Sequence, residues 1–209
     1  MNFIYLHGFA SCPQSAKAIY LVDKLATLGR SLQVPNLNQS NFSDLTITRQ
    51  IEQVIELFES TTEPITLIGS SLGGLTAAWL GQKNLQVQRL VLLAPAFGFL
   101  DHWLPKLGAT QLQEWQSSGF LPVYHYCESR TIPLHYKFVE DAHQYQEIPL
   151  LRPVPTLILH GRHDQVIPIK ASQDYASVRP WVKLIELDSD HALIDVMPIT
   201  WSEISSFCL

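Results

Sequence analysis

The sequence has little charge and no long apolar run. Asp, Glu, Lys and Arg make up 16% of the 209 residues, the formal net charge is -5, and no cluster of basic residues stands out. Proteins that bind nucleic acid usually gather Lys and Arg on one face, so nucleic-acid binding is not expected. The longest apolar stretch, residues 90–100, covers only about half of a membrane span and contains Pro95. Stable membrane insertion is therefore not expected either.

Cysteine is also scarce. The number of cysteines is odd, and their spacing is not that of metal ligands: Cys12, Cys127 and Cys208. We expect all three to be reduced thiols in a cytoplasmic protein. The chain enters an apolar strand at residues 3–6 without the basic start and long apolar stretch of a secretion signal. The eight histidines show no ligand spacing, so no metal is expected. Residues 69–74 match neither the Walker nor the dinucleotide glycine pattern, so no cofactor is expected.

Short apolar runs and segments of helical periodicity alternate along the chain. Runs buried on both faces, alternating with helices, indicate a parallel sheet covered on two sides. The length and the 46% hydrophobic content suit one domain. We therefore expect a three-layer α/β domain over residues 1–209 with about six parallel strands. The expected strands are 3–6, 32–34, 65–69, 89–94, 156–160 and 183–187, and the expected helices are 15–28, 43–58 (capped by Ser43), 72–85, 169–178 and a last one after Pro198.

The clearest functional signal is the pentapeptide Gly-Ser-Ser-Leu-Gly at residues 69–73. It follows an apolar run and opens a segment with helical spacing. Gly-x-Ser-x-Gly between a strand and a helix is the nucleophile elbow, a sharp turn that lifts one serine above a parallel sheet. A Cβ two residues to either side of that serine would collide with the neighbouring strand and helix. The positions of the glycines select Ser71 as the nucleophile and leave Ser70 as a spacer.

A serine hydroxyl needs a base, and the base needs a group that orients it. His191 lies just past the last expected strand, where hydrolases with this elbow carry their histidine. Asp164 follows the strand 156–160 in a short loop at the same edge of the sheet, so its carboxylate could hold the imidazole in one tautomer. Asp101 is the rival acid. Asp188 and Asp190 are expected to be surface charges or turn formers.

An oxyanion hole requires backbone N–H groups. Leu72 directly follows the serine at the positive end of a helix and should supply one donor. The loop after the first strand should supply the other, because Gly8 allows a close approach to the ligand and Phe9 would present its N–H group. His7 is expected to brace this loop. His160 and His163 are expected to support the loop that carries Asp164.

An insertion between residues 97 and 152 interrupts the alternation of strands and helices. It is rich in Trp, Tyr and Phe, and residues 123–126 and 132–138 could pair as a β-hairpin. The insertion follows the carboxyl end of a strand, where ligands bind in open α/β sheets. Two interpretations remain open: a cap over the active site, or an extra packing layer without a role in substrate binding. Arg130, Lys137, Arg152 and Arg162 are only a faint indication of a basic pocket.

These motifs resemble the α/β-hydrolase superfamily, and more narrowly the small bacterial esterases of the YqiA/YcfP type. The matching stretches are residues 5–9, 15–17, 68–74 and 128–130, together with His191-Ala192, which Asp190 precedes here. The resemblance spans most of the chain but is weak in the insertion. It implies a compact fold without the first strands of the full superfamily, and cofactor-free activity on short acyl esters, with thioesters as a further substrate class.

The sequence thus predicts a serine esterase with Ser71, His191 and Asp164 as catalytic residues and the N–H groups of Phe9 and Leu72 as the oxyanion hole. Its partner would be a small-molecule acyl ester of short to medium chain length. The alternative is a protein that keeps the hydrolase fold but binds a small ligand or another protein without turnover. The oligomeric state stays open.

Overall fold

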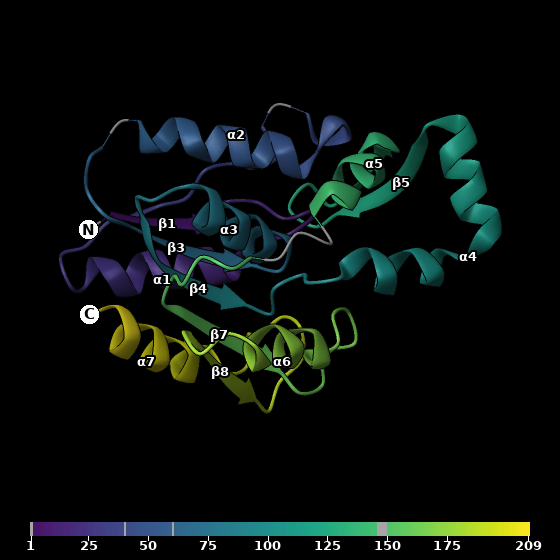
Figure 1. Ribbon diagram of the computed structural model, residues 1–209. Helices are drawn as coiled ribbons and strands as arrows, with labels where there is room; N and C mark the ends of the chain where they lie inside the picture. Colours follow the sequence, from purple (N-terminus) through teal and green to yellow (C-terminus); the bar gives the residue numbers. More distant parts are fainter. Residues whose placement is uncertain (1, 40, 60, 146–149) are drawn as a thin grey trace.

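Six parallel strands form the central sheet of the protein. The computed structural model describes residues 2–39, 41–59, 61–145 and 150–209. The strands lie in the order β2-β1-β3-β4-β7-β8 (Figure 1), and every neighbouring pair is parallel. Their bounds are β1 Asn2–Leu6, β2 Leu32–Gln33, β3 Ile65–Ser70, β4 Val87–Leu93, β7 Thr156–Gly161 and β8 Val182–Leu187. The predicted α/β class with six parallel core strands is confirmed.

Helices cover both faces of this sheet because its strands are apolar on both sides. Along β1, Phe3 and Tyr5 belong to one buried cluster, whereas Ile4 and Leu6 belong to the other. The helices α1 (Ala16–Ala26) and α7 (Met197–Cys208) pack into the cluster of Phe3 and Tyr5. The opposite cluster contains residues of α2 (Ile47–Phe58) and α3 (Leu72–Lys83), and α6 (Ile169–Ser177) packs against it. The result is the predicted three-layer arrangement.

The start of α2 differs from the prediction. Ser43 lies inside a short 3-10 helix, η1 (Phe42–Asp44), and does not cap α2. Thr46 takes that role, because its hydroxyl accepts a hydrogen bond of 3.0 Å from the N–H group of Arg49. A threonine oxygen satisfies one of the free N–H groups of a first helical turn as well as a serine does.

The insertion holds a long helix and a hairpin beyond the carboxyl ends of the strands (Figure 1). The hairpin is confirmed as an antiparallel pair of β5 and β6. Helix α4 was not predicted, because Pro105 and Gly108 interrupt its helical pattern, and Gly108 kinks it with φ 76°. Residues 146–149 of the predicted insertion lie outside the described residues. The bounds are α4 Phe99–Ser118, β5 Phe120–His125, β6 Arg130–His135, α5 Lys137–Ala142 and η2 His143–Tyr145.

A disulfide ties the insertion to the sheet. Cys12, in the loop after β1, is bonded to Cys127, in the turn of the β5–β6 hairpin, with their Cα atoms 6.1 Å apart. Next to this bond, the N–H group of Tyr126 donates to the carbonyl of Ala10 at 3.0 Å. The prediction of reduced thiols is therefore wrong for this pair, which folding brings together across 115 residues of sequence. Cys208 is free and buried, and burial raises the pKa of its thiol to about 11.

Candidate active site

Ser71 stands at a strained turn between β3 and α3. Its φ is 52° and its ψ is -117°, a backbone conformation that side chains rarely adopt and that is concentrated at functional sites. The flanking glycines make the turn possible. A Cβ on Gly69 would lie 2.3 Å from the carbonyl oxygen of Gly73, and one on Gly73 would lie 2.2 Å from the carbonyl oxygen of Leu6. The backbone thus has the geometry expected of a nucleophile elbow.

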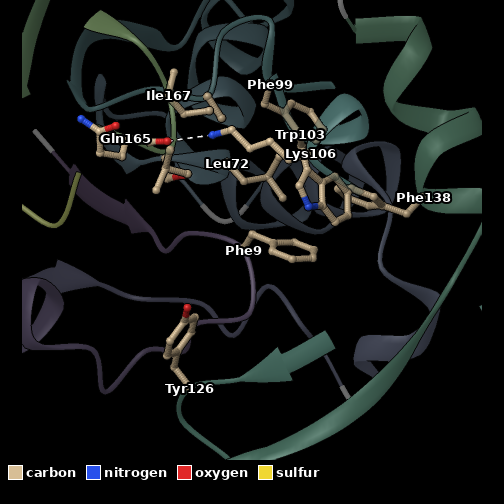
Figure 2. Close-up of a pocket in the computed structure, with 12 residues that line it drawn as sticks. Phe9, Leu72, Phe99, Trp103, Lys106, Tyr126, Phe138, Gln165 and Ile167 are labelled. Carbon is tan, nitrogen blue, oxygen red and sulfur yellow. Dashed lines mark hydrogen bonds between the residues drawn. The ribbon is translucent and has the colours of Figure 1, made fainter. Parts of the chain in front are cut away.

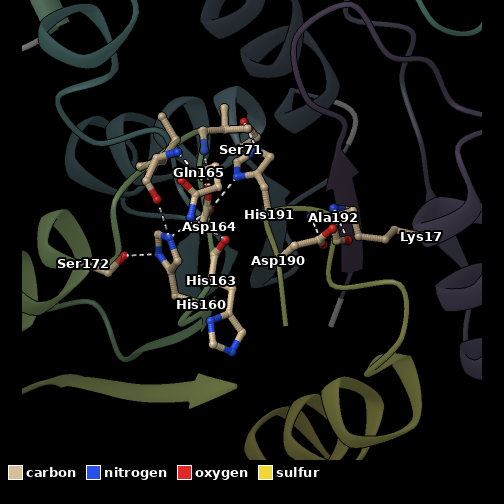
Figure 3. A network of polar contacts seen from close by, with 12 residues as sticks. Lys17, Ser71, His160, His163, Asp164, Gln165, Ser172, Asp190, His191 and Ala192 are labelled. Carbon is tan, nitrogen blue, oxygen red and sulfur yellow. Dashed lines mark hydrogen bonds and ion pairs between the residues drawn. The ribbon is translucent and has the colours of Figure 1, made fainter. Parts of the chain in front are cut away.

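The structure brings Ser71, His191 and Asp164 into one hydrogen-bonded chain (Figure 3). Ser71 Oγ lies 3.0 Å from His191 Nε2, and His191 Nδ1 lies 2.6 Å from Asp164 Oδ2. Ser71 follows β3, Asp164 follows β7 and His191 follows β8, so loops at one edge of the sheet supply all three side chains. With Nδ1 as the donor to the carboxylate, Nε2 is free to accept the serine proton.

The carboxylate of Asp164 is held on both of its oxygens. Oδ1 accepts hydrogen bonds of 2.8 Å from the N–H groups of Val166 and Ile167, and Oδ2 accepts one of 3.0 Å from His160 Nε2. Burial by itself would raise the pKa of Asp164. The hydrogen bonds from His160 and His191, together with the charge of His191, outweigh burial and lower that pKa well below its usual range. Asp164 is therefore ionised whenever the protein is folded at neutral pH.

His160 supports this carboxylate from beneath, as the sequence predicts for the loop. The ring is fully buried, and its Nε2 also lies 3.0 Å from the carbonyl oxygen of Ile167. With Nε2 as the donor, Nδ1 accepts a hydrogen bond of 2.7 Å from the hydroxyl of Ser172. The second predicted support, His163, instead lies at the surface and contacts Asp188 at 2.8 Å.

The loop that carries His191 is pressed against the end of β7. A Cβ on Gly161 would lie 2.4 Å from the carbonyl oxygens of both Ser189 and Asp190, so only glycine permits this approach. On the other side of the loop, Lys17 Nζ donates a hydrogen bond of 2.9 Å to the carbonyl of Ala192 (Figure 3). Burial lowers the pKa of Lys17 to about 8, although Asp190 and Asp164 act in the opposite direction. Residues 15–17 match the esterase family, but the contact of Lys17 with the His191 loop was not predicted.

The expected oxyanion donors lie beside the serine. In the described part of the chain, the N–H groups of Phe9 and Leu72 have no hydrogen-bond acceptor. Gly8 brings the first loop close, since a Cβ there would lie 3.3 Å from Ser71 Cβ. His7 braces this loop: its Nδ1 donates to the Gly8 carbonyl at 2.9 Å, and its Nε2 accepts from the N–H group of Leu37 at 3.0 Å. Burial lowers the pKa of His7 to about 4, so the ring is neutral.

The other candidates lie away from the serine. Asp101 is exposed in the first turn of α4. Asp188 pairs with His163, and Asp190 Oδ1 accepts from the N–H group of Ala192 in a turn, at 2.8 Å. Across the described ranges, no group of three or more His, Cys, Asp or Glu side chains is arranged to hold a metal ion. None of the helices in these ranges combines the length and the hydrophobicity that a membrane span requires.

An apolar cavity of about 360 Å³ opens beside Ser71 (Figure 2). Leu72 and Ile167 line it from the α/β core, and the insertion adds Phe99, Trp103 and Phe138. The rings of Phe9, Trp103 and Phe138 contact one another. Lys106 stands at the cavity and donates to the carbonyl of Gln165 at 2.7 Å. Four basic residues were a faint indication of a basic pocket in the sequence. This cavity is lined by none of them, that is, by neither Arg130, Lys137, Arg152 nor Arg162.

Comparison with known proteins places the chain in a family. The model of the uncharacterised protein family UPF0227 matches residues 2–208. The chain belongs to UPF0227. No curated protein matches it. The predicted α/β-hydrolase fold is confirmed, because solved structures of that fold superpose on this UPF0227 chain over nearly its whole length.

Three of those structures show how similar the fold is. A protein from Agrobacterium vitis S4 is 24% identical with a TM-score of 0.86, covering 100% of this chain and 88% of its own. The α/β hydrolase domain-containing protein 10 from mouse is 22% identical with a TM-score of 0.78, covering 98% and 90%. The monoacylglycerol lipase of Paleococcus ferrophilus is 14% identical with a TM-score of 0.75, covering 98% and 93%. At these identities the likeness establishes the fold alone.

Proposed function

We propose that this protein is a serine hydrolase that cleaves carboxylic esters through a Ser71–His191–Asp164 triad. The observation that carries the proposal is the continuous hydrogen-bonded chain from Ser71 Oγ through His191 to Asp164, set on a strained elbow beside an apolar cavity. Each member has the partner that its role requires: a base for the nucleophile, and an ionised, buried carboxylate for the base. The hydrolase fold and the lipase with the same fold support this reaction class.

The first half of the reaction forms an acyl-enzyme. Ser71 Oγ attacks the ester carbonyl carbon while His191 Nε2 takes the hydroxyl proton. The negative charge on the carbonyl oxygen is stabilised by the N–H groups of Phe9 and Leu72. The bond from carbon to the leaving oxygen then breaks, and His191 gives its proton to that oxygen, which departs as an alcohol.

The second half releases the acid. A water molecule gives a proton to His191 Nε2 and attacks the acyl carbon, and the bond to Ser71 Oγ breaks as the proton returns to the serine. Asp164 keeps its charge throughout and stabilises the positively charged imidazole that forms in each half. The sum is one ester and one water converted to one acid and one alcohol, with neither a metal nor a cofactor.

The acyl chain fits the apolar cavity, and this placement favours the cap interpretation of residues 97–152. Phe99, Trp103 and Phe138 come from the insertion and form much of the wall beside Ser71. A cavity of about 360 Å³ suits a chain of short to medium length. Apart from Lys106, whose ammonium donates to the Gln165 carbonyl, its described lining is uncharged, which favours a neutral acyl group. Carboxylic esters are the expected substrates, and thioesters the second choice.

Hydrolysis of p-nitrophenyl esters tests this function. We expect activity on acetate to octanoate esters with a maximum at intermediate chain length, and a loss of several orders of magnitude in kcat for Ser71→Ala, because the triad acts as a unit. A Ser71→Ala protein with near wild-type kcat on p-nitrophenyl butyrate would refute the assignment. Ser70→Ala is the matched control and should retain the triad.

A cytoplasmic location is a separate part of the proposal. Disulfides are rare in reducing compartments, so the state of Cys12 and Cys127 in intact cells reports on the location. Trapping of thiols with a maleimide before lysis should modify both residues if the protein is cytoplasmic. Protection of both from the maleimide would indicate an oxidising compartment.

A further inference from the structure

Two cavities meet at Ser71, and His191 lines only one of them. The apolar cavity has no His191 in its wall. A second hollow, of about 510 Å³, is lined by both Ser71 and His191 and by residues at the start of α1, among them Ser15 and Lys17. We call it the His191-side cavity. Phe9 and Tyr126 line both spaces and so mark the boundary between them.

The chemistry of ester cleavage distinguishes the two cavities. The leaving oxygen receives its proton from His191 Nε2 and must therefore lie within hydrogen-bond reach of that atom. A leaving group attached to this oxygen extends on the His191 side of the serine. The acyl chain is on the other side of the scissile bond and enters the apolar cavity. The His191-side cavity is thus the place where the leaving group would be recognised.

Lys17 gives the His191-side cavity a positive charge. It is the one Lys or Arg that lines this cavity in the described part of the chain, and no described Asp or Glu lines it. Its ammonium has three N–H donors, of which one is used on the carbonyl of Ala192. Asp190 and Asp164 lie close enough to attract the ammonium, but no described carboxylate forms a salt bridge with it. Two donors therefore stay available to a ligand.

The start of α1 adds further donors around Lys17. Ser15, Ala16 and Lys17 line the cavity together, and the first N–H groups of a helix have no partner within it and favour negative charge. The Ser15 side chain makes no capping hydrogen bond. Its hydroxyl is buried near that of Tyr5 but makes no hydrogen bond of acceptable geometry with a described residue. A compact anion here could accept hydrogen bonds from several groups at once.

We propose that the His191-side cavity binds the leaving group of the ester and that Lys17 selects a leaving group with a single negative charge, such as a short hydroxy acid. This inference rests on the proposed ester hydrolysis. The restriction to one charge follows from the neighbouring surface. Ala192 and Ile194 also border a hollow lined by Asp188, Asp190 and Asp195, and these carboxylates would repel a second charge or an extended polyanion.

A matched pair of esters tests the proposal. O-butyryl-3-hydroxypropanoate carries a carboxylate on the leaving group, and O-butyryl-3-hydroxypropanamide is its neutral counterpart. We expect wild-type kcat/KM to be about tenfold higher for the carboxylate, the size of one charge-assisted hydrogen bond in a partly exposed site. Lys17→Met should reduce this preference to less than about twofold, and Lys17→Arg should keep most of it. The concentration of active enzyme is measured by titrating its serine with a fluorophosphonate. Each rate is divided by that concentration, so that unfolded protein does not affect the comparison.

The controls separate the possible failures. Lys24→Met removes the same charge from the same helix, where Lys24 lies over the Tyr20 ring, and should leave the preference unchanged. If Lys17→Met lowers kcat/KM equally for both esters, Lys17 only holds the His191 loop, and the proposal is overturned. A wild-type ratio of kcat/KM near one between the carboxylate and the amide ester would overturn it as well. Faster cleavage of 2-(butyryloxy)ethyl phosphate than of the carboxylate would overturn the single-charge assignment. Failure to cleave either ester through Ser71 would instead overturn the proposed hydrolysis itself.

Discussion

At the scale of single residues, the most constrained group is the Asp164 carboxylate. Two backbone N–H groups, His160 and His191 all donate to it, and its side chain is fully buried. A buried charge is tolerated only when it is paired and hydrogen-bonded, and Asp164 meets both conditions. Its orientation, and with it that of the His191 ring, therefore depends on the short loop after β7 rather than on solvent.

Asp164→Asn should slow catalysis far more than it changes folding. The amide cannot hold His191 in the tautomer that accepts the serine proton, which lowers kcat by about three to four orders of magnitude in enzymes of this kind. Steady-state hydrolysis of p-nitrophenyl butyrate measures the loss. A variant that retains more than a tenth of wild-type kcat would mean that the Asp164 carboxylate is not what orients the histidine.

The same residue should govern stability in acid. The pKa of Asp164 is lower in the folded protein than in the unfolded chain. The ionised carboxylate therefore stabilises the fold fully above the pKa that Asp164 has in the unfolded chain. This stabilisation is lost as the pH falls through the lower pKa that Asp164 has in the folded protein. Urea midpoints measured from pH 6 to pH 3 should therefore decline more steeply for the wild type than for Asp164→Asn. Parallel declines for the two proteins would contradict the predicted ionisation.

At the scale of elements, the elbow depends on how closely α3 approaches β1. Gly73 lies in the first turn of α3, and its Cα faces the carbonyl oxygen of Leu6 at the end of β1. The backbone atoms on both sides are fixed by the parallel pairing of β1 with β3. Any side chain at this position must move a strand, a helix or the serine between them.

Gly73→Ala should destabilise the protein by about 3 kcal/mol or more, the upper part of the range for overpacked cores. Gly81→Ala is the matched control within α3. There the nearest atoms to a Cβ belong to the flexible Leu90 side chain rather than to backbone, the first of them at 2.9 Å, and alanine is the better helix former by about 1 kcal/mol. Denaturant unfolding of the two variants compares them directly, and equal costs would contradict the account of the elbow.

The elements differ in how far the sequence could predict them. Strands such as β3 and β7 were predictable because their apolar runs end at glycines that the elbow and the acid loop require. Helix α4 was not predictable, because Pro105 and Gly108 interrupt its periodicity. Its Trp side chains contact rings of other segments, which its own pattern does not indicate: Phe9, Tyr136 and Phe138. Lys17 lies in a stretch that matches the esterase family, but its contact with the His191 loop follows only from the packing of α1 beside that loop. The aromatic insertion indicated a ligand site beside the serine, but the His191-side cavity could not be predicted, since residues far apart in sequence form it.

At the scale of the whole molecule, one covalent bond connects the core to the insertion. The Cys12–Cys127 disulfide joins the loop that presents the Phe9 N–H group to the hairpin that carries Tyr126. Tyr126 lines both cavities. The disulfide therefore fixes the position of Tyr126 relative to the Phe9 N–H group, which is an expected oxyanion donor. It also restricts the conformations of the unfolded chain.

Loss of this disulfide should lower the free energy of unfolding by about 2–4 kcal/mol, as is typical for closing a long loop. The double variant Cys12→Ser/Cys127→Ser and the wild type treated with dithiothreitol should show the same reduced midpoint in urea. Dithiothreitol should not shift the midpoint of the double variant further, since Cys208 is free. A wild-type midpoint that is insensitive to dithiothreitol would contradict the expected contribution of this bond.

The most direct test of the central claim, that Ser71 is an activated nucleophile, is its reaction with a fluorophosphonate probe followed by peptide mass spectrometry. We predict a single adduct on Ser71, no adduct on Ser70, no labelling of Ser71→Ala and strongly slowed labelling of Asp164→Asn. A folded wild-type protein that leaves the probe unreacted, or that carries it on another serine, would contradict the account and would favour a binding protein with the hydrolase fold.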